Sequence, residues 1–96
     1  MHSFSTDQID RSKYGDAGYF CERSQYQYVL PESERFVDSK RNLYVLGYAG
    51  ADGIEFVLKP HEDSVYAFYP NTGELHCIAP DFATFIVGWI NGGIGV

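Results

Sequence analysis

The chain has 96 residues, of which 45% are hydrophobic and 21% charged, as is usual for one small folded domain. Thirteen acidic residues against seven basic ones give a net charge of −6, which argues against direct binding of nucleic acid, because phosphates need cationic groups opposite them. No apolar run approaches the length of about 18 residues that a membrane-spanning helix needs.

The charge is distributed unevenly along the chain. Residues 42–96 hold six acids and one base, a net of −5, whereas residues 1–41 have a net of −1. A partner that is steered toward the second half would therefore be basic. The N-terminus lacks the apolar core of an export signal, and two cysteines are too few for a disulfide framework. We expect a cytoplasmic protein in which Cys21 and Cys77 are free thiols.

The first 41 residues give weak structural signals. Residues 1–17 are polar and without a clear period, and we interpret them as a loosely ordered arm. Short strands are predicted at residues 19–21 and 26–30, and Pro31 ends the second because its nitrogen has no hydrogen to give to a ladder. Residues 31–41 are expected to form a charged connection with a short helical turn.

The pattern is clearer from residue 43 onward. Segments 43–48, 54–59, 65–69 and 75–78 are rich in aromatic and β-branched residues, and turn residues separate them. In the second segment Ile54, Phe56 and Leu58 alternate onto one face. Short strands joined by short turns predict an antiparallel meander.

The last element is predicted to be a helix that begins after Pro80 and Asp81, residues that suit a first helical turn. Apolar residues then recur at i, i+3, i+4, i+7 and i+8, at Phe82, Phe85, Ile86, Trp89 and Ile90. This stripe needs an apolar surface, and the sheet offers the only one of that size. The predicted fold is a single α+β domain over residues 1–96, with an antiparallel sheet of four to six strands and the C-terminal amphipathic helix packed on one face.

Three segments within residues 42–91 carry a resemblance to a known family. They read Tyr-Val-Leu-Gly-Tyr-Ala-Gly-Ala-Asp-Gly at 44–53, Ser-Val-Tyr-Ala-Phe-Tyr at 64–69 and Cys-Ile-Ala-Pro-Asp-Phe-Ala-Thr-Phe-Ile at 77–86. Their order and spacing resemble the SUKH superfamily, which includes a fungal cell-wall regulator and many bacterial toxin-immunity proteins. Members usually begin with helices around a Leu-Pro segment, and Leu30-Pro31 lacks that context here, as in a minimal or N-terminally truncated form. The resemblance implies a protein that neutralises its partner by occluding it.

No pattern of catalytic or metal-ligating residues emerges. His76 and Cys77 are neighbours in a predicted strand, so their side chains point to opposite faces and cannot form a nucleophile–base pair. Cys77 alternates with Leu75 and Ala79, which predicts a buried thiol. Structural zinc sites usually show closely spaced ligand pairs. Such pairs are missing among Cys21, His61, His76 and Cys77. We expect a non-catalytic protein with no cofactor and no metal.

The remaining candidate is a surface on which tyrosine lies among carboxylates, a composition suited to contacting a basic protein. The residues expected to bind the partner are Asp52, Glu55, Glu62, Asp63, Tyr66 and Glu74. The function expected is that of an immunity-type inhibitor that occludes a toxin or a nuclease-like protein. The alternative is an acidic inhibitor, encoded by a phage or mobile element, that mimics nucleic acid. Homo-oligomerisation is left open.

Overall fold

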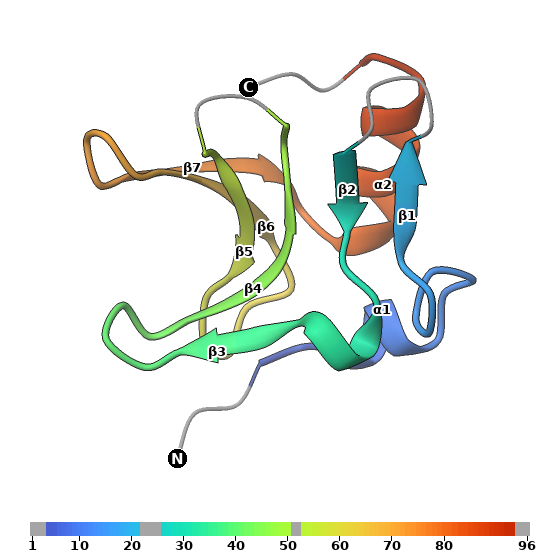
Figure 1. Ribbon diagram of the computed structural model, residues 1–96, viewed down its shortest axis with the longest axis horizontal. Coiled ribbons are helices and arrows are strands. Elements are labelled where there is room, and N and C mark those ends of the chain that lie inside the picture. The colour runs from blue at the N-terminus through green and yellow to red at the C-terminus, as the bar shows by residue number, and fades with distance from the viewer. Residues whose placement is uncertain (1–3, 22–25, 51–52, 94–96) are drawn as a thin grey trace.

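The computed structural model describes residues 4–21, 26–50 and 53–93. It contains a five-stranded antiparallel sheet in the order β3-β4-β5-β6-β7, a two-stranded sheet of β1 and β2, and a C-terminal helix, so the α+β class is as predicted (Figure 1). The elements are α1 (Asp7–Asp10), β1 (Tyr19–Cys21), β2 (Tyr26–Val29), a 3₁₀ turn (Glu32–Glu34), β3 (Phe36–Asp38), β4 (Leu43–Tyr48), β5 (Glu55–Leu58), β6 (Val65–Tyr69), β7 (Glu74–Ala79) and α2 (Phe82–Ile90).

The five-stranded sheet bends so that the β3–β4 and β6–β7 hairpins project to the same side of the molecule (Figure 1). Residues that lie opposite each other in an antiparallel pair share a face. The strand register therefore defines a core face with Tyr44, Leu46, Phe56, Leu58, Val65 and Ala67. It also defines a second face, here called the aromatic face, with Phe36, Asp38, Leu43, Val45, Tyr48, Glu55, Val57, Tyr66, Phe68, Leu75 and Cys77.

Helix α2 covers the core face, as its apolar stripe predicts. The Phe85 ring is fully buried, with its centre 4.6 Å from that of Phe56, and the centre of the Trp89 ring lies 4.8 Å from that of Phe56. The stripe is less complete than expected at its end, because Trp89 is only partly buried and Ile90 is 44% exposed. Asp81 caps the helix, since its Oδ1 accepts a hydrogen bond from the Thr84 N–H at 2.7 Å.

The front of the chain differs from the expected loose arm. Residues 7–10 form α1, and Ile9 is fully buried in the same core as α2. The Gln8 side-chain amide donates to the Asp63 carbonyl at 3.0 Å and accepts from the Phe82 N–H at 2.6 Å. One buried apolar residue and one bridging amide thus attach residues 4–17 to the body of the domain.

A buried arginine organises the segment expected to be only a charged connection. The Arg35 side chain is 0% exposed and donates to the carbonyls of Leu30 and Gly15, both at 2.8 Å, and to the Tyr44 hydroxyl at 3.0 Å. Its Nη2 also lies 3.3 Å from Asp10 Oδ1. A buried guanidinium needs this full set of acceptors. Strand β3, which the sequence pattern did not predict, follows directly after Arg35.

The two sheets meet by direct backbone contact at Gly47. The Leu30 N–H donates to the Leu46 carbonyl at 2.8 Å, and a Cβ at Gly47 would collide with the Tyr28 carbonyl. Glycine is required here because no side chain fits between β2 and β4. The close approach places the Tyr28 ring 5.4 Å from that of Trp89, so the β1–β2 ribbon packs over α2 (Figure 1).

Candidate functional site

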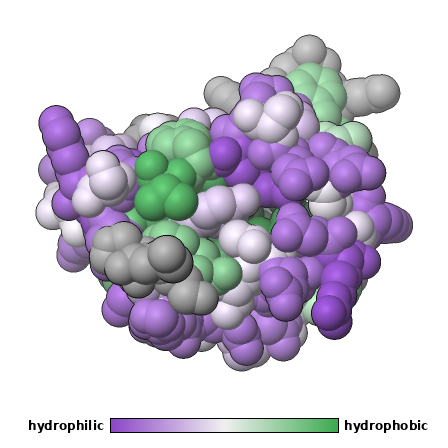
Figure 2. Space-filling view, turned by 90° about the horizontal axis from the view of Figure 1, so that it is seen from below, coloured by the Kyte–Doolittle hydropathy of each residue, from purple (hydrophilic) through white to green (hydrophobic). Residues whose placement is uncertain are grey.

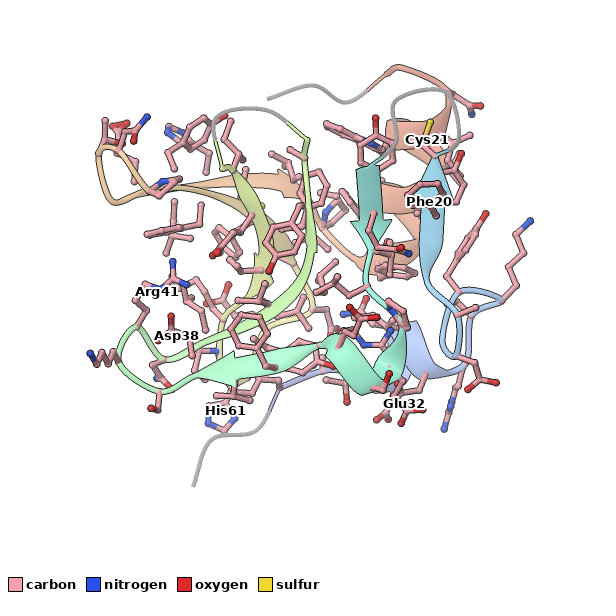
Figure 3. All side chains as sticks on the ribbon, in the orientation of Figure 1. Phe20, Cys21, Glu32, Asp38, Arg41 and His61 are labelled. Atoms are coloured by element: carbon pink, nitrogen blue, oxygen red, sulfur yellow. The ribbon has the colours of Figure 1, made fainter. Side chains whose placement is uncertain are left out.

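Arg41 is the central charged residue of the aromatic face. Its Nε and Nη2 both lie 2.7 Å from Asp38 Oδ2, and its Nη2 also lies 3.0 Å from Glu55 Oε1, an ion pair without a well-directed hydrogen bond. The guanidinium carbon sits 4.3 Å from the centre of the Phe68 ring. Figure 3 shows Arg41 directed from the β3–β4 hairpin into the space between the two projecting hairpins. Arg41 therefore ties β3, β5 and β6 together across this face.

The hairpin that carries Arg41 is preorganised by Asp38. The Asp38 Oδ1 accepts hydrogen bonds from the backbone N–H groups of Lys40 and Arg41 at 3.1 and 3.2 Å, which closes the turn. The bond from the Arg41 side chain holds the pKa of Asp38 below its ordinary value. Burial alone would lower the pKa of Arg41, but the bond to Asp38 and the charge of Glu55 outweigh it and raise that pKa. Asp38 and Arg41 are therefore both charged at neutral pH.

A second cation–carboxylate–ring cluster lies beside the first. The Tyr66 hydroxyl donates to Glu62 Oε1 at 2.6 Å, Lys59 Nζ is 3.7 Å from Glu62 Oε2, and the same Nζ lies 5.1 Å from the centre of the Tyr66 ring. The side chains of Lys59 and Glu62 are about 40% exposed, at 40% and 39%. A surface ion pair of this length contributes little stability, so Glu62 can exchange Lys59 for another cation.

Two tyrosines on this face stay neutral well into the alkaline range. The hydrogen bond to Glu62 is the main cause that raises the pKa of Tyr66 to about 12. Burial, reinforced by the charge of Glu55, raises the pKa of Tyr48. Both phenols therefore remain hydrogen-bond donors at any physiological pH.

The aromatic face has an apolar floor and half-exposed rings above it. Leu43, Val45 and Val57 are buried, and Tyr48, Tyr66 and Phe68 pack against them while remaining partly exposed. Apolar side chains of this face extend to the β3 margin, where Phe36 is 43% exposed. Figure 2, which views the molecule from the side of β3, shows apolar surface surrounded by hydrophilic residues. Rigid rings on a packed floor with charged groups around them are typical of protein-binding surfaces.

The structure brings together three of the six residues expected to bind a partner. Glu55 and Tyr66 lie on the aromatic face, and Glu62 is bonded to Tyr66. Glu74 faces the other way, because it pairs with Tyr69 and lies two residues from His76, whose ring packs edge-on against Tyr69 at 5.0 Å. Asp63 also lies away from this face, and Asp52 lies outside the described residues.

The prediction of a buried thiol at Cys77 is wrong. Cys77 is exposed, and Leu75 is 36% exposed, because both lie near the free edge of the sheet on β7 rather than beneath α2. Alternation in the sequence cannot distinguish an edge strand from a central one.

The part of the chain that the structure describes contains neither a metal-binding cluster nor a membrane-spanning helix. Among the residues described, no group of three or more His, Cys, Asp or Glu side chains is arranged to hold a metal ion. Neither α1 nor α2 has the length and apolar character needed to cross a bilayer. A surface pocket of about 530 Å³ beside α1 is lined by Asp7, Asp63 and Asp81 together with Arg11, but its acids do not converge on one point.

Sequence reasoning missed Asp38 and Arg41. They lie in the segment interpreted as a connection, and only the pairing of β3 with β4 places them on the aromatic face. The spacing Asp-x-x-Arg ahead of a strand is the one signal that could have suggested a paired hairpin turn.

Comparison with known proteins adds no relative to these observations. No protein-family model, no curated protein and no solved structure matches this chain. The assignment of a function therefore rests on the residues of the aromatic face.

Proposed function

We propose that this chain is a non-catalytic, cytoplasmic protein-binding domain that occludes a basic partner through its aromatic face, in the manner of the SUKH-type immunity proteins that its sequence resembles. The observation that carries the proposal is the pair of clusters on β6, in which Phe68 and Tyr66 each lie beneath a cation that is paired with a carboxylate. Each cluster places a flat apolar ring beside a carboxylate, and the carboxylate of the Tyr66 cluster can exchange its own cation for one from a partner.

The two clusters support different roles in binding. Arg41 is held by two carboxylates, and its side chain is only 29% exposed, so it fixes the shape of the face. Glu62 is paired only with a half-exposed lysine, and a guanidinium from a partner could displace that lysine and stack on Tyr66. The contact surface is therefore centred on Tyr66 and Glu62, with Glu55 as a positioning residue.

The charge of the chain supports a basic partner. Asp38, Glu55 and Glu62 outnumber Arg41 and Lys59 on and beside this face, and residues 42–96 carry a net charge of −5. Such a field speeds the encounter with a cationic surface. The same ion pairs give no support to mimicry of nucleic acid, because a mimic presents free carboxylates and these are largely neutralised.

The test compares proteins captured by the wild-type chain with those captured by matched variants. Glu62→Lys combined with Tyr66→Ala removes the proposed contacts, and Glu32→Lys makes a similar charge change on the exposed 3₁₀ turn. A true partner is retained by wild type and Glu32→Lys and lost by the double variant. Equal capture by all three would place the interface elsewhere.

The immunity role has its own readout. The captured partner, expressed alone, should arrest growth of the host cell, and co-expression of the wild-type chain should restore it. The double variant should fail to restore growth while remaining folded. If the captured partner does not arrest growth when expressed alone, the chain is still a protein-binding domain, but the immunity role is contradicted.

A further inference from the structure

Strand β7 (Glu74–Ala79) forms an edge of the five-stranded sheet and is exposed along most of its length. In the described part of the chain it pairs with β6 alone, so the backbone N–H and C=O groups on its other side have no strand partner. It has six residues, against three or four in β1, β2 and β3, and its first four are exposed. It is therefore the longest strand edge that the described residues present.

This edge lacks the usual protection against pairing. Natural edge strands carry lysine, proline or a central bulge that prevents another strand from docking. No lysine or proline occurs between Glu74 and Ala79, and the one irregularity in its pairing lies at its C-terminal end, opposite Val65 and Tyr66. Leu75 and Cys77 instead present exposed apolar side chains on the aromatic face.

We infer that β7 pairs antiparallel with β7 of a second copy of this chain, so that the two five-stranded sheets form one continuous sheet. A two-fold axis through Leu75 places Leu75 opposite its own counterpart. The same axis places Glu74 of each copy opposite His76 of the other copy, so the pair occurs twice in the dimer.

The side chains of β7 are complementary to themselves in this register. Glu74 and His76 share a face and lie 3.6 Å apart within one chain, with side chains 60% and 56% exposed, so the imidazole N–H of one copy can exchange this long contact for the carboxylate of the other copy. Leu75 against Leu75 buries two half-exposed apolar side chains. Moving the axis by one residue would instead set two His76 rings opposite each other and Glu74 opposite Ile78. Charge and apolar matching therefore select the second copy as occupant, with the axis at Leu75.

Dimerisation in this way leaves the Tyr66–Glu62 part of each aromatic face free and buries only Leu75 at its margin. Opposite residues of an antiparallel pair share a face, so both aromatic faces lie on the same side of the joined sheet. The dimer would then present two copies of the Tyr66–Glu62 surface to one partner. The dimer and the proposed binding function can be tested separately, since the dimer uses Leu75 at the margin of the aromatic face and the proposed contacts with the partner use Tyr66 and Glu62.

The first test is sedimentation equilibrium of the wild-type chain over a wide concentration range. The expected result is a reversible monomer–dimer equilibrium. Leu75→Lys sets two ammonium groups opposite each other and should raise the dissociation constant about tenfold or more. Val37→Lys, on the exposed β3 edge, is the matched control and should leave it unchanged. A wild-type chain that stays monomeric throughout would overturn the inference.

The second test fixes the register. In a background with Cys21→Ser and Cys77→Ser, Leu75→Cys should form an intermolecular disulfide under mild oxidation, because directly opposite residues lie about 5 Å apart. Val37→Cys should not. In the wild-type dimer the two Cys77 residues would be four positions apart along the strands, about 13 Å, and should not cross-link.

Two outcomes of the second test would contradict the proposed pairing. Equal cross-linking of Leu75→Cys and Val37→Cys would refute the register. Rapid disulfide formation by the wild-type Cys77 would also refute it. A third outcome is a monomeric chain in which the amide hydrogens of β7 gain exchange protection only when a captured partner is added. In that case the partner binds the β7 edge, and the dimer is rejected.

Discussion

The Arg41 guanidinium covers the Phe68 ring at 4.3 Å while its nitrogens contact the carboxylates of Asp38 and Glu55. Planarity allows one side chain to stack and to donate from its edge at the same time. An ammonium group cannot do both. The aromatic face therefore depends on arginine in particular at this position and not on positive charge alone.

Replacing Arg41 with lysine should lower the free energy of unfolding by about 1–2 kcal/mol, because the stacked contact and the forked bond to Asp38 are lost while the charge stays. Urea unfolding measures this change. Arg11→Lys, on the exposed end of α1, should leave the midpoint unchanged. If the two variants unfold alike, Arg41 does not organise this face.

Tyr66 should ionise later than an ordinary tyrosine when phenolate absorbance is followed as the pH rises. Its folded-state pKa is raised from 10.0 to about 12 by Glu62, so the associated stability is fully present below pH 10 and is lost as the pH rises toward 12. Glu62→Gln should move this late phase to lower pH. Asp63→Asn, at the neighbouring residue, should leave it in place.

Removing the buried guanidinium should be among the most damaging single changes in the chain. Arg35→Met leaves the carbonyls of Leu30 and Gly15 without their donor and should cost about 3–5 kcal/mol. The measurement is urea unfolding, with Arg11→Met as the control for loss of a surface charge. A loss below about 1 kcal/mol would mean that water replaces these bonds.

Alanine substitutions at a buried and at an exposed position of α2 should have very different effects on the free energy of unfolding. Phe85 is fully buried against Phe56, and Phe85→Ala should cost about 3–5 kcal/mol. Val87 is 58% exposed, and Val87→Ala should change stability by no more than about 0.5 kcal/mol. Thermal and urea unfolding would compare them. Similar losses at both sites would contradict the placement of α2 on the core face.

The order of the sheet and the buried side of α2 could be predicted, because short-range periodicity and turn residues determine them. The antiparallel succession of β4 to β7, the start of α2 after Asp81 and the buried ring of Phe85 all follow from local pattern. Between Leu43 and Ile90 local preference and tertiary structure therefore agree, except at Cys77 on the edge strand and at Ile90, which are exposed.

The front of the chain could not be predicted, because single long-range contacts hold it. Ile9 is one apolar residue in a polar stretch, and the acceptors of Arg35 come from residues up to 25 positions away. The same limit applies to the site, where Glu55 and Tyr66 were found from alternation but Arg41 was not. Its role depends on a three-residue strand too short to produce a period.

The amide of Gln8 connects residues 55 and 74 positions further along the chain. During synthesis from the N-terminus, Gln8 and Ile9 emerge while the α2 sequence has not yet been translated. Helix α1 therefore cannot complete its contacts until the residues of α2 have left the ribosome, so this part of the core forms late. Until then Ile9 lacks the apolar side chains of α2 that complete its burial.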